Sequence, residues 1–142
     1  MVEKRFRLGA HEMWLDVDTG IVCYMYCGLL TGPDMAEMFE VSVKWHQEVN
    51  PDGPWLYLID NRKLKGVRGD ARKDIAKLTQ TIGDCYTAIY GASFALRVVL
   101  NLVFKAASLV TSRVVLRYAA NESEAREWLI ACRRAHIARA AG

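Results

Sequence analysis

Residues 21–35 read IVCYMYCGLLTGPDM and contain the two patterns that decide the fold. The first seven, Ile21 to Cys27, are apolar or aromatic throughout, which is typical of a central strand. Gly28 ends that strand. Thr31 is a suitable N-cap for a helix, and Pro33 is tolerated in the first turn, where its missing N–H has no partner within the helix. The stretch therefore predicts a buried strand followed directly by a helix.

The segments on either side of this stretch have patterns of their own. The helix carries an apolar face at spacings of three and four residues, made by Met35, Met38, Phe39, Ser42, Trp45 and Val49. The segment from Asn50 to Pro54, rich in proline and glycine, ends it. Upstream, residues 13–18 alternate between two faces, which predicts a strand with one buried face. Asp18-Thr19-Gly20 is a tight turn, so this strand joins the central strand as a hairpin and runs antiparallel to it.

Downstream, strand and helix patterns take turns along the chain. The predicted strands are residues 55–60, 85–91 and 113–118, and the predicted helices are residues 71–82, 94–107 and 121–136. A helix after each of four successive strands calls for parallel strands joined by right-handed crossovers. The sequence therefore predicts an α/β domain. Its sheet is mostly parallel and five-stranded, with an antiparallel first strand and the strand at 113–118 at an edge.

Length and composition fit one ordinary globular domain. The 142 residues are 52% hydrophobic and 25% charged, which excludes a disordered chain, a collagen-like fibre and a disulfide-dense miniprotein. We expect a single domain over 1–142, with an N-terminal extension over 1–11 and a basic helix end over 133–142. No signal peptide or membrane span is predicted, and the four cysteines form no CxxC pair, so we expect reduced thiols and a cytoplasmic location.

The order of these elements, with their turn residues, resembles the SpoIIAA-like superfamily, which comprises the STAS domains (anti-sigma factor antagonists) and the STAS/SEC14-like small bacterial proteins. The matching residues, spread over roughly 12 to 132, are Gly28-Leu-Leu-Thr31, Leu58-Ile-Asp60, Lys65-Gly66 with Ala71-Arg72, Ala88-Ile-Tyr-Gly91 with Ala92-Ser93, and Glu124-Ala125-Arg-Glu-Trp-Leu129. The resemblance implies a right-handed β/α superhelix with four helices mainly on one face of the sheet. It also implies a role in protein–protein regulation, with no chemistry by the domain itself.

The chain departs from this family at the usual regulatory position. Phosphorylatable STAS domains carry a serine or threonine at the start of the helix after the third strand. Here that place reads Val67-Arg68-Gly69-Asp70-Ala71, and residues 61–74 contain no serine or threonine. We therefore expect no phosphorylation switch at this position.

A basic segment follows the third predicted strand. Arg62, Lys63, Lys65, Arg68, Arg72 and Lys73 surround a single acidic residue, Asp70. A loop here would lie at the carboxyl end of a parallel strand and before a helix N-terminus, where backbone N–H groups and the helix dipole favour anions. The predicted anion or partner site comprises Asp60, Arg62, Lys63, Lys65, Arg68, Gly69, Asp70 and Arg72. The alternative interpretation is a solvated basic loop.

The sequence offers little for catalysis. His11, His46 and His136 lie on separate predicted elements, without the spacing of zinc ligands. Ser93 follows a strand but lacks the GxSxG context of a nucleophile elbow, and capping the next helix is its commoner role. We therefore expect no enzymatic activity, no metal and no cofactor.

The predicted helix at 94–107 is apolar on more than one side. Only Arg97, Asn101 and Lys105 are polar, in one row along the helix. We expect part of this helix to form a homodimer or partner interface through Leu96, Val99, Leu100, Val103 and Phe104. The alternatives are a central position between neighbouring helices and an apolar or lipid pocket.

These observations favour a non-catalytic regulatory or protein-interaction domain of the STAS-like type, acting as a homodimer with a protein partner still to be identified. The alternative function is binding of a phosphate-bearing or lipid-like small molecule at the basic loop. A net charge of +3, from 19 basic and 16 acidic residues, is too small to indicate nucleic acid. No integral membrane association is expected, because the longest apolar block is far short of a membrane span.

Overall fold

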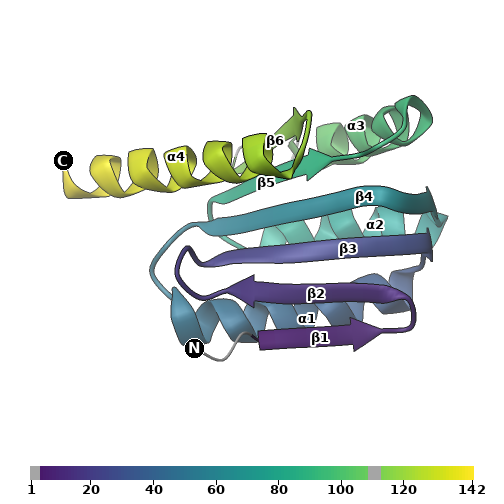
Figure 1. Ribbon diagram of the computed structural model, residues 1–142, viewed down its shortest axis with the longest axis horizontal. Helices are drawn as coiled ribbons and strands as arrows, with labels where there is room; N and C mark the ends of the chain where they lie inside the picture. Colours follow the sequence, from purple (N-terminus) through teal and green to yellow (C-terminus); the bar gives the residue numbers. More distant parts are fainter. Residues whose placement is uncertain (1–3, 109–112) are drawn as a thin grey trace.

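The computed structural model describes residues 4–108 and 113–142, which form one sheet and its helices (Figure 1). The strands are β1 (Lys4–Leu8), β2 (His11–Asp16), β3 (Ile21–Leu30), β4 (Trp55–Val67), β5 (Cys85–Tyr90) and β6 (Val114–Ala119). The helices are α1 (Gly32–Val49), α2 (Gly69–Leu78), α3 (Phe94–Ser108) and α4 (Glu122–Ala141), with a short 3₁₀ turn at Thr79–Thr81.

The strands lie in the sheet in their sequence order, from β1 to β6. β1, β2 and β3 are successively antiparallel, and β3 to β6 are parallel. The predicted hairpin is confirmed: Gly20 has φ 76°, and its N–H donates to the Asp16 carbonyl at 2.8 Å. The parallel sheet, the antiparallel strand before it and the edge position of β6 agree with the sequence prediction.

The sheet has one more described strand than predicted, six rather than five. Residues 1–11 were expected to be an extension, but Lys4–Leu8 pairs along its whole length with His11–Leu15. Phe6 and Leu8 are half-buried against the main core, while Arg5 and Arg7, which alternate with them, are exposed. The three basic residues in this short segment hide its period of two, which is why the pattern was missed.

β4 is also longer than predicted. Residues 62–67 are not a loop but continue the strand beside the end of β3. The register against β3 shifts twice, between Met25 and Cys27 and between Gly28 and Leu29. Each shift inserts an extra residue into β4, so its buried side chains no longer recur at every second position. The first shift places Asn61 and Leu64 in the interior although they are three residues apart.

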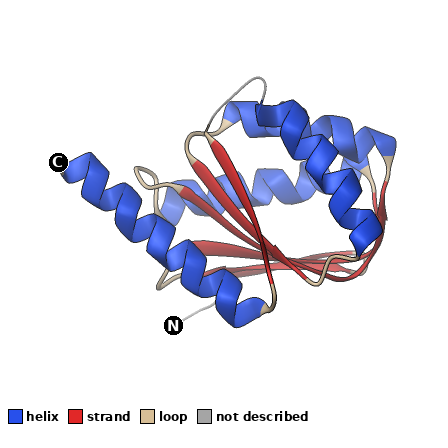
Figure 2. Cartoon of the chain, turned by 90° about the horizontal axis from the view of Figure 1, so that it is seen from above, coloured by secondary structure: helices blue, strands red, loops and turns tan. Residues whose placement is uncertain are grey.

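Helices cover the sheet unequally. α1, α2 and α3 lie on one face, and α4 lies across the other, as Figure 2 shows. The larger core, between the sheet and the first three helices, contains Tyr24, Tyr26 and Tyr57. The smaller core forms where Ala125 and Leu129 of α4 pack on β3, β4 and β5. The prediction of helices mainly on one face is confirmed. Each crossover from β3 to β6 adds its strand on the same side of the previous strand and its helix on the same face of the sheet. The three crossovers therefore have the same handedness.

His46 makes the stability of this fold depend on pH. Its side chain is only 6% exposed and its ring stacks on Trp55 with centroids 3.7 Å apart. Burial lowers the pKa of His46, because the charged ring is poorly solvated there. The unfolded chain therefore binds a proton below about pH 6.5 that the folded chain does not take up until lower pH.

We expect the free energy of unfolding to fall as the pH drops below about 6.5, and to fall less in a His46→Phe variant, which keeps the stacked ring but cannot titrate. Urea unfolding between pH 5 and pH 8 measures both chains. Equal pH profiles for wild type and variant would show that His46 does not carry this dependence.

Candidate functional site

The first residues of the predicted anion site form an ion pair. Asp60 is 5% exposed and accepts hydrogen bonds from the backbone N–H, Nε and Nη2 of Arg62, at 3.0, 3.0 and 2.8 Å. Burial alone would raise the pKa of Asp60, but the hydrogen bonds from Arg62 outweigh it and lower the pKa. The Arg62 guanidinium also lies over the Tyr90 ring, 5.6 Å from its centroid. Arg62 therefore already interacts with Asp60 and Tyr90 of its own chain.

Asp70 has a structural role at the start of α2. Its Oδ1 accepts from the Gly32 N–H at 3.0 Å and from the Ala71 N–H at 2.8 Å, so it ties the N-terminus of α1 to that of α2. Arg68 pairs with the same carboxylate and holds its pKa well below the usual range. A β-carbon on Gly32 would lie 2.8 Å from this carboxylate, which explains the glycine.

The remaining basic residues do not converge on one point. Arg72 donates from Nε to the Val67 carbonyl at 3.1 Å, while Lys63, Lys65 and Lys73 are exposed. Gly69 begins α2 rather than lining a loop. The structure thus brings the predicted residues together as two internal ion pairs and a set of exposed lysines along β4 and α2, and an anion site here stays a prediction.

The apolar helix α3 turns a different side outward from the one predicted. Leu96, Leu100 and Val103 are 6%, 4% and 6% exposed, so they belong to the core and cannot form an interface in this fold. Val99 and Phe104 are half-buried. The large apolar side chains that are exposed on the described part of this helix are instead Phe94, Val98 and Leu102. The periodicity of the sequence does not indicate which side of the helix is buried, because two apolar stripes run along it. Packing in the folded chain determines which stripe contacts the sheet.

The polar row of α3 faces the edge strand. The Arg97 guanidinium lies over the Tyr118 ring, 5.0 Å from its centroid. The Tyr118 hydroxyl donates to Asn101 Oδ1 at 2.9 Å. β6 therefore occupies the side of α3 next to its exposed apolar stripe, and the stripe itself is left without a partner in the described part of the chain.

Two of the cysteine thiols are buried and unreactive. All four cysteines are free, and burial raises the pKa of Cys23 and of Cys85 to about 12, so both thiols stay protonated. Within residues 4–108 and 113–142, no three His, Cys, Asp or Glu side chains are placed to hold a metal ion. None of the helices in those ranges is long and apolar enough to cross a membrane.

A cavity lies between the sheet and α1, α2 and α3, and Leu100 and Phe104 of the helix for which an apolar pocket was an alternative interpretation contribute to its lining. Its lining combines three tyrosines of β3 and β4 with aliphatic residues from the three helices, and Asn61 lies among them. Two sequence signals point toward it: the alternation of β3, which puts Tyr24 and Tyr26 on the same side, and the apolar composition of residues 94–107. The cavity itself depends on how side chains from separate elements fit together, which no local pattern records.

Comparison with known proteins identifies the fold. No family model matches the sequence, and no curated protein matches it. One solved structure, of an uncharacterized protein from the DUF3478 family with a SpoIIAA-like fold from Shewanella loihica PV-4, superposes with a TM-score of 0.56 at 18% identity. The match covers 90% of this chain and 92% of that one. Together with the sheet order and the placement of the helices, it shows that this chain has the SpoIIAA-like fold.

Proposed function

We propose that the chain is a non-catalytic interaction domain of the STAS-like type, and that it pairs with a second copy of itself through α3. The observation that carries the proposal is the exposed row of Phe94, Val98 and Leu102, which are 83%, 45% and 66% exposed. These residues are four apart, so they form one continuous stripe along the helix. Large apolar side chains grouped in this way are typical of interaction surfaces.

The stripe is complementary to itself. Val98 stands four residues from both Phe94 and Leu102, so a two-fold axis through Val98 would place Phe94 of one copy against Leu102 of the other. Antiparallel helices satisfy that symmetry, and symmetric pairs are the commonest oligomers. The stripe is short, which puts the expected dimer among weak associations with dissociation in the micromolar range.

A charged side chain placed in the stripe should make the dimer dissociate. We expect Leu102→Glu to shift the chain to monomer, because a carboxylate at the interface would be desolvated against Phe94 without a partner. The expected loss of affinity is at least about tenfold, measured by sedimentation from low to high micromolar concentration.

Ile137→Glu is the matched control, because Ile137 is 51% exposed on α4 and lies outside the stripe. It should leave association unchanged. Equal effects of the two substitutions, or a wild-type chain that is monomeric throughout, would contradict the proposed interface.

A cysteine at Val98 tests the symmetry itself. Helix axes in such pairs are about 8–10 Å apart, so two residues on the axis come within the reach of a disulfide. We expect mild oxidation to cross-link Val98→Cys efficiently, and Leu102→Cys poorly. The wild-type chain, with its own four cysteines, sets the background. Efficient cross-linking of Leu102→Cys with none at Val98→Cys would place the axis elsewhere.

The alternative function, binding of a phosphate-bearing or lipid-like molecule at the basic segment, draws its support from exposed Lys63 and Lys65 on β4. It is the weaker proposal, because the two nearest arginines pair with Asp60 and Asp70. A thermal shift with nucleotides or anionic lipid that disappears in Lys63→Ala/Lys65→Ala would favour it.

A further inference from the structure

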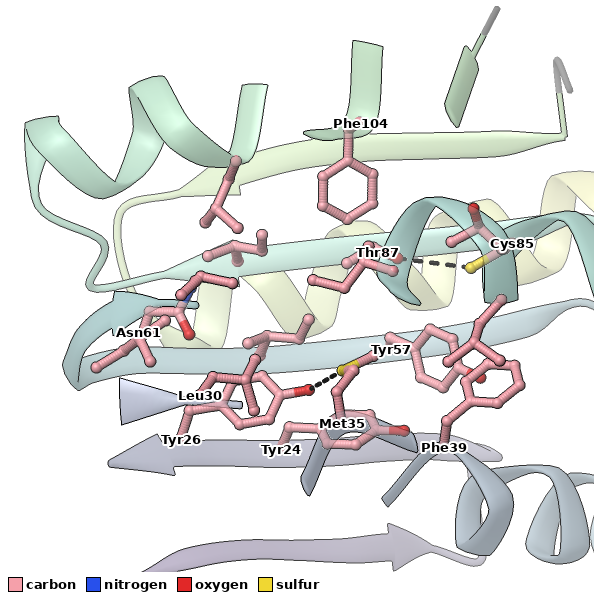
Figure 3. Close-up of a pocket in the computed structure, with 18 of the residues that line it drawn as sticks. Tyr24, Tyr26, Leu30, Met35, Phe39, Tyr57, Asn61, Cys85, Thr87 and Phe104 are labelled. Atoms are coloured by element: carbon pink, nitrogen blue, oxygen red, sulfur yellow. Dashed lines mark hydrogen bonds between the residues drawn. The ribbon is translucent and has the colours of Figure 1, made fainter. Parts of the chain in front are cut away.

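The cavity behind the tyrosines contains one polar atom that the protein does not satisfy. Asn61 is 2% exposed, and its Oδ1 has no hydrogen-bond partner among the described residues. Figure 3 shows Asn61 at one end of the cavity, with Phe39 and Cys85 at the other. Leaving a buried carbonyl oxygen without a hydrogen bond is costly. In native structures such an atom is usually paired with a group outside the protein, such as water or a ligand.

Several other polar groups of the cavity lining have partners. The Tyr57 hydroxyl lies 3.2 Å from Ser42 Oγ, and the Tyr26 hydroxyl donates to Met35 Sδ at 3.7 Å. Cys85 Sγ and Thr87 Oγ1 are 3.5 Å apart. Among the described residues, Asn61 Oδ1 is the fully buried side-chain oxygen or nitrogen that has no partner, and it requires a hydrogen-bond donor.

Water is a poor occupant for this place. The cavity has a volume of about 60 Å³, which is room for several water molecules. A buried water needs about two to four polar partners, whereas the lining is mostly aliphatic and aromatic carbon and Asn61 Oδ1 is the only fully buried side-chain oxygen or nitrogen without a partner among the described residues. An apolar molecule with a single donor group would fill the space and satisfy the oxygen.

The lining also excludes charge. Among the described residues that line the cavity there is no lysine, arginine, histidine, aspartate or glutamate. Burial raises the pKa of Tyr26 and Tyr57 well above the ordinary value, so both phenols remain neutral. A carboxylate or phosphate placed here would be desolvated without a counter-charge, which is strongly unfavourable.

We propose that this cavity is a binding site for a small neutral alcohol, whose hydrocarbon part fills the apolar space and whose hydroxyl donates to Asn61 Oδ1. The cavity volume limits the ligand to about four to six non-hydrogen atoms. The site is separate from the α3 stripe, because Phe94, Val98 and Leu102 do not line it.

Butan-2-ol and butan-2-one provide the test, because they share one carbon skeleton and only the alcohol can donate a hydrogen bond. The methyl group of Met35 lines the cavity, and its carbon-13 NMR signal reports occupancy in the full chain. We expect both compounds to bind in the millimolar range, with the alcohol about tenfold tighter, since the ketone leaves the Asn61 oxygen unpaired. Butyrate should not bind.

In an Asn61→Leu variant, of similar size and without the acceptor, the alcohol and the ketone should bind equally. If the variant does not fold, the comparison in the wild-type chain still decides. Equal affinities for the alcohol and the ketone in the wild type would overturn the role of Asn61. No change of the Met35 signal with either compound would overturn the site.

Discussion

Replacing Leu129 by alanine will lower the free energy of unfolding by about 3 kcal/mol. Leu129 is fully buried and stands at the centre of the smaller core, between α4 and the sheet. Among the described residues of α4 only Ala125 is buried to the same degree, so Leu129 is the largest fully buried side chain of this helix. The substitution removes the transfer energy of the side chain and leaves a cavity that a single helix cannot close without tilting.

Urea unfolding measures the loss, and Ile137→Ala is the control because Ile137 lies on the same helix with 51% of its side chain exposed. The control should change the free energy of unfolding by less than about 0.5 kcal/mol. A loss at Leu129 as small as that of the control would mean that α4 does not pack on the sheet as described.

Replacing Gly91 by alanine will cost about as much as the loss of Leu129, roughly 3 kcal/mol in total, for two separate reasons. Gly91 has φ 78°, a conformation that costs other residues about 1–2 kcal/mol. A β-carbon there would also lie 2.3 Å from Arg62 Cγ and 3.0 Å from the Arg62 backbone nitrogen. Arg62 cannot simply move away, because its side chain and its N–H are both bonded to Asp60.

Gly28→Ala separates the two contributions. Gly28 has φ 74°, but a β-carbon at that position would meet nothing within 4 Å, so only the conformational cost remains. We expect Gly91→Ala to be the more destabilising of the two by at least about 1 kcal/mol in urea unfolding. Equal losses would show that Arg62 can yield to the added carbon, and that the bulge of β4 is less rigid than its contacts indicate.

Local patterns predicted the parts of the fold whose causes are local. Thr31 and Asn121 cap their helices, and their side chains accept from the N–H groups of Asp34 and Glu124 at 3.4 and 2.9 Å. Ser93 caps α3 in the same way, by accepting from the Leu96 N–H at 3.2 Å. Alternation and turn residues were enough for the hairpin and the parallel strands, because each is determined by neighbouring residues.

Features that depend on distant contacts were beyond these patterns. The extension of β4 depends on its pairing with β3. The two register shifts interrupt the alternation of buried and exposed residues, which is the pattern that predicts a strand. Asn61 is drawn inward by the first of these shifts, so nothing in its neighbours marks it as a cavity residue. The partners of Asp60 and Asp70 within the chain, Arg62, Arg68 and the Gly32 N–H, were not predicted either.

The exposed stripe of α3 also depends on distant contacts that the sequence pattern does not record. The composition of residues 94–107 indicated that more than one side of the helix would be apolar, and it is. Which side remained outside depended on the sheet, since Leu96 and Leu100 pack into the main core and leave Phe94 and Leu102 exposed.

Native mass spectrometry of the gently purified chain tests the central claim, that this domain works by pairing through α3. The proposal predicts a dimer for the wild-type chain at high micromolar concentration, and a monomer for Leu102→Glu under the same conditions. A wild-type chain that remains monomeric at the highest concentration, or a dimer that Leu102→Glu leaves intact, would contradict it.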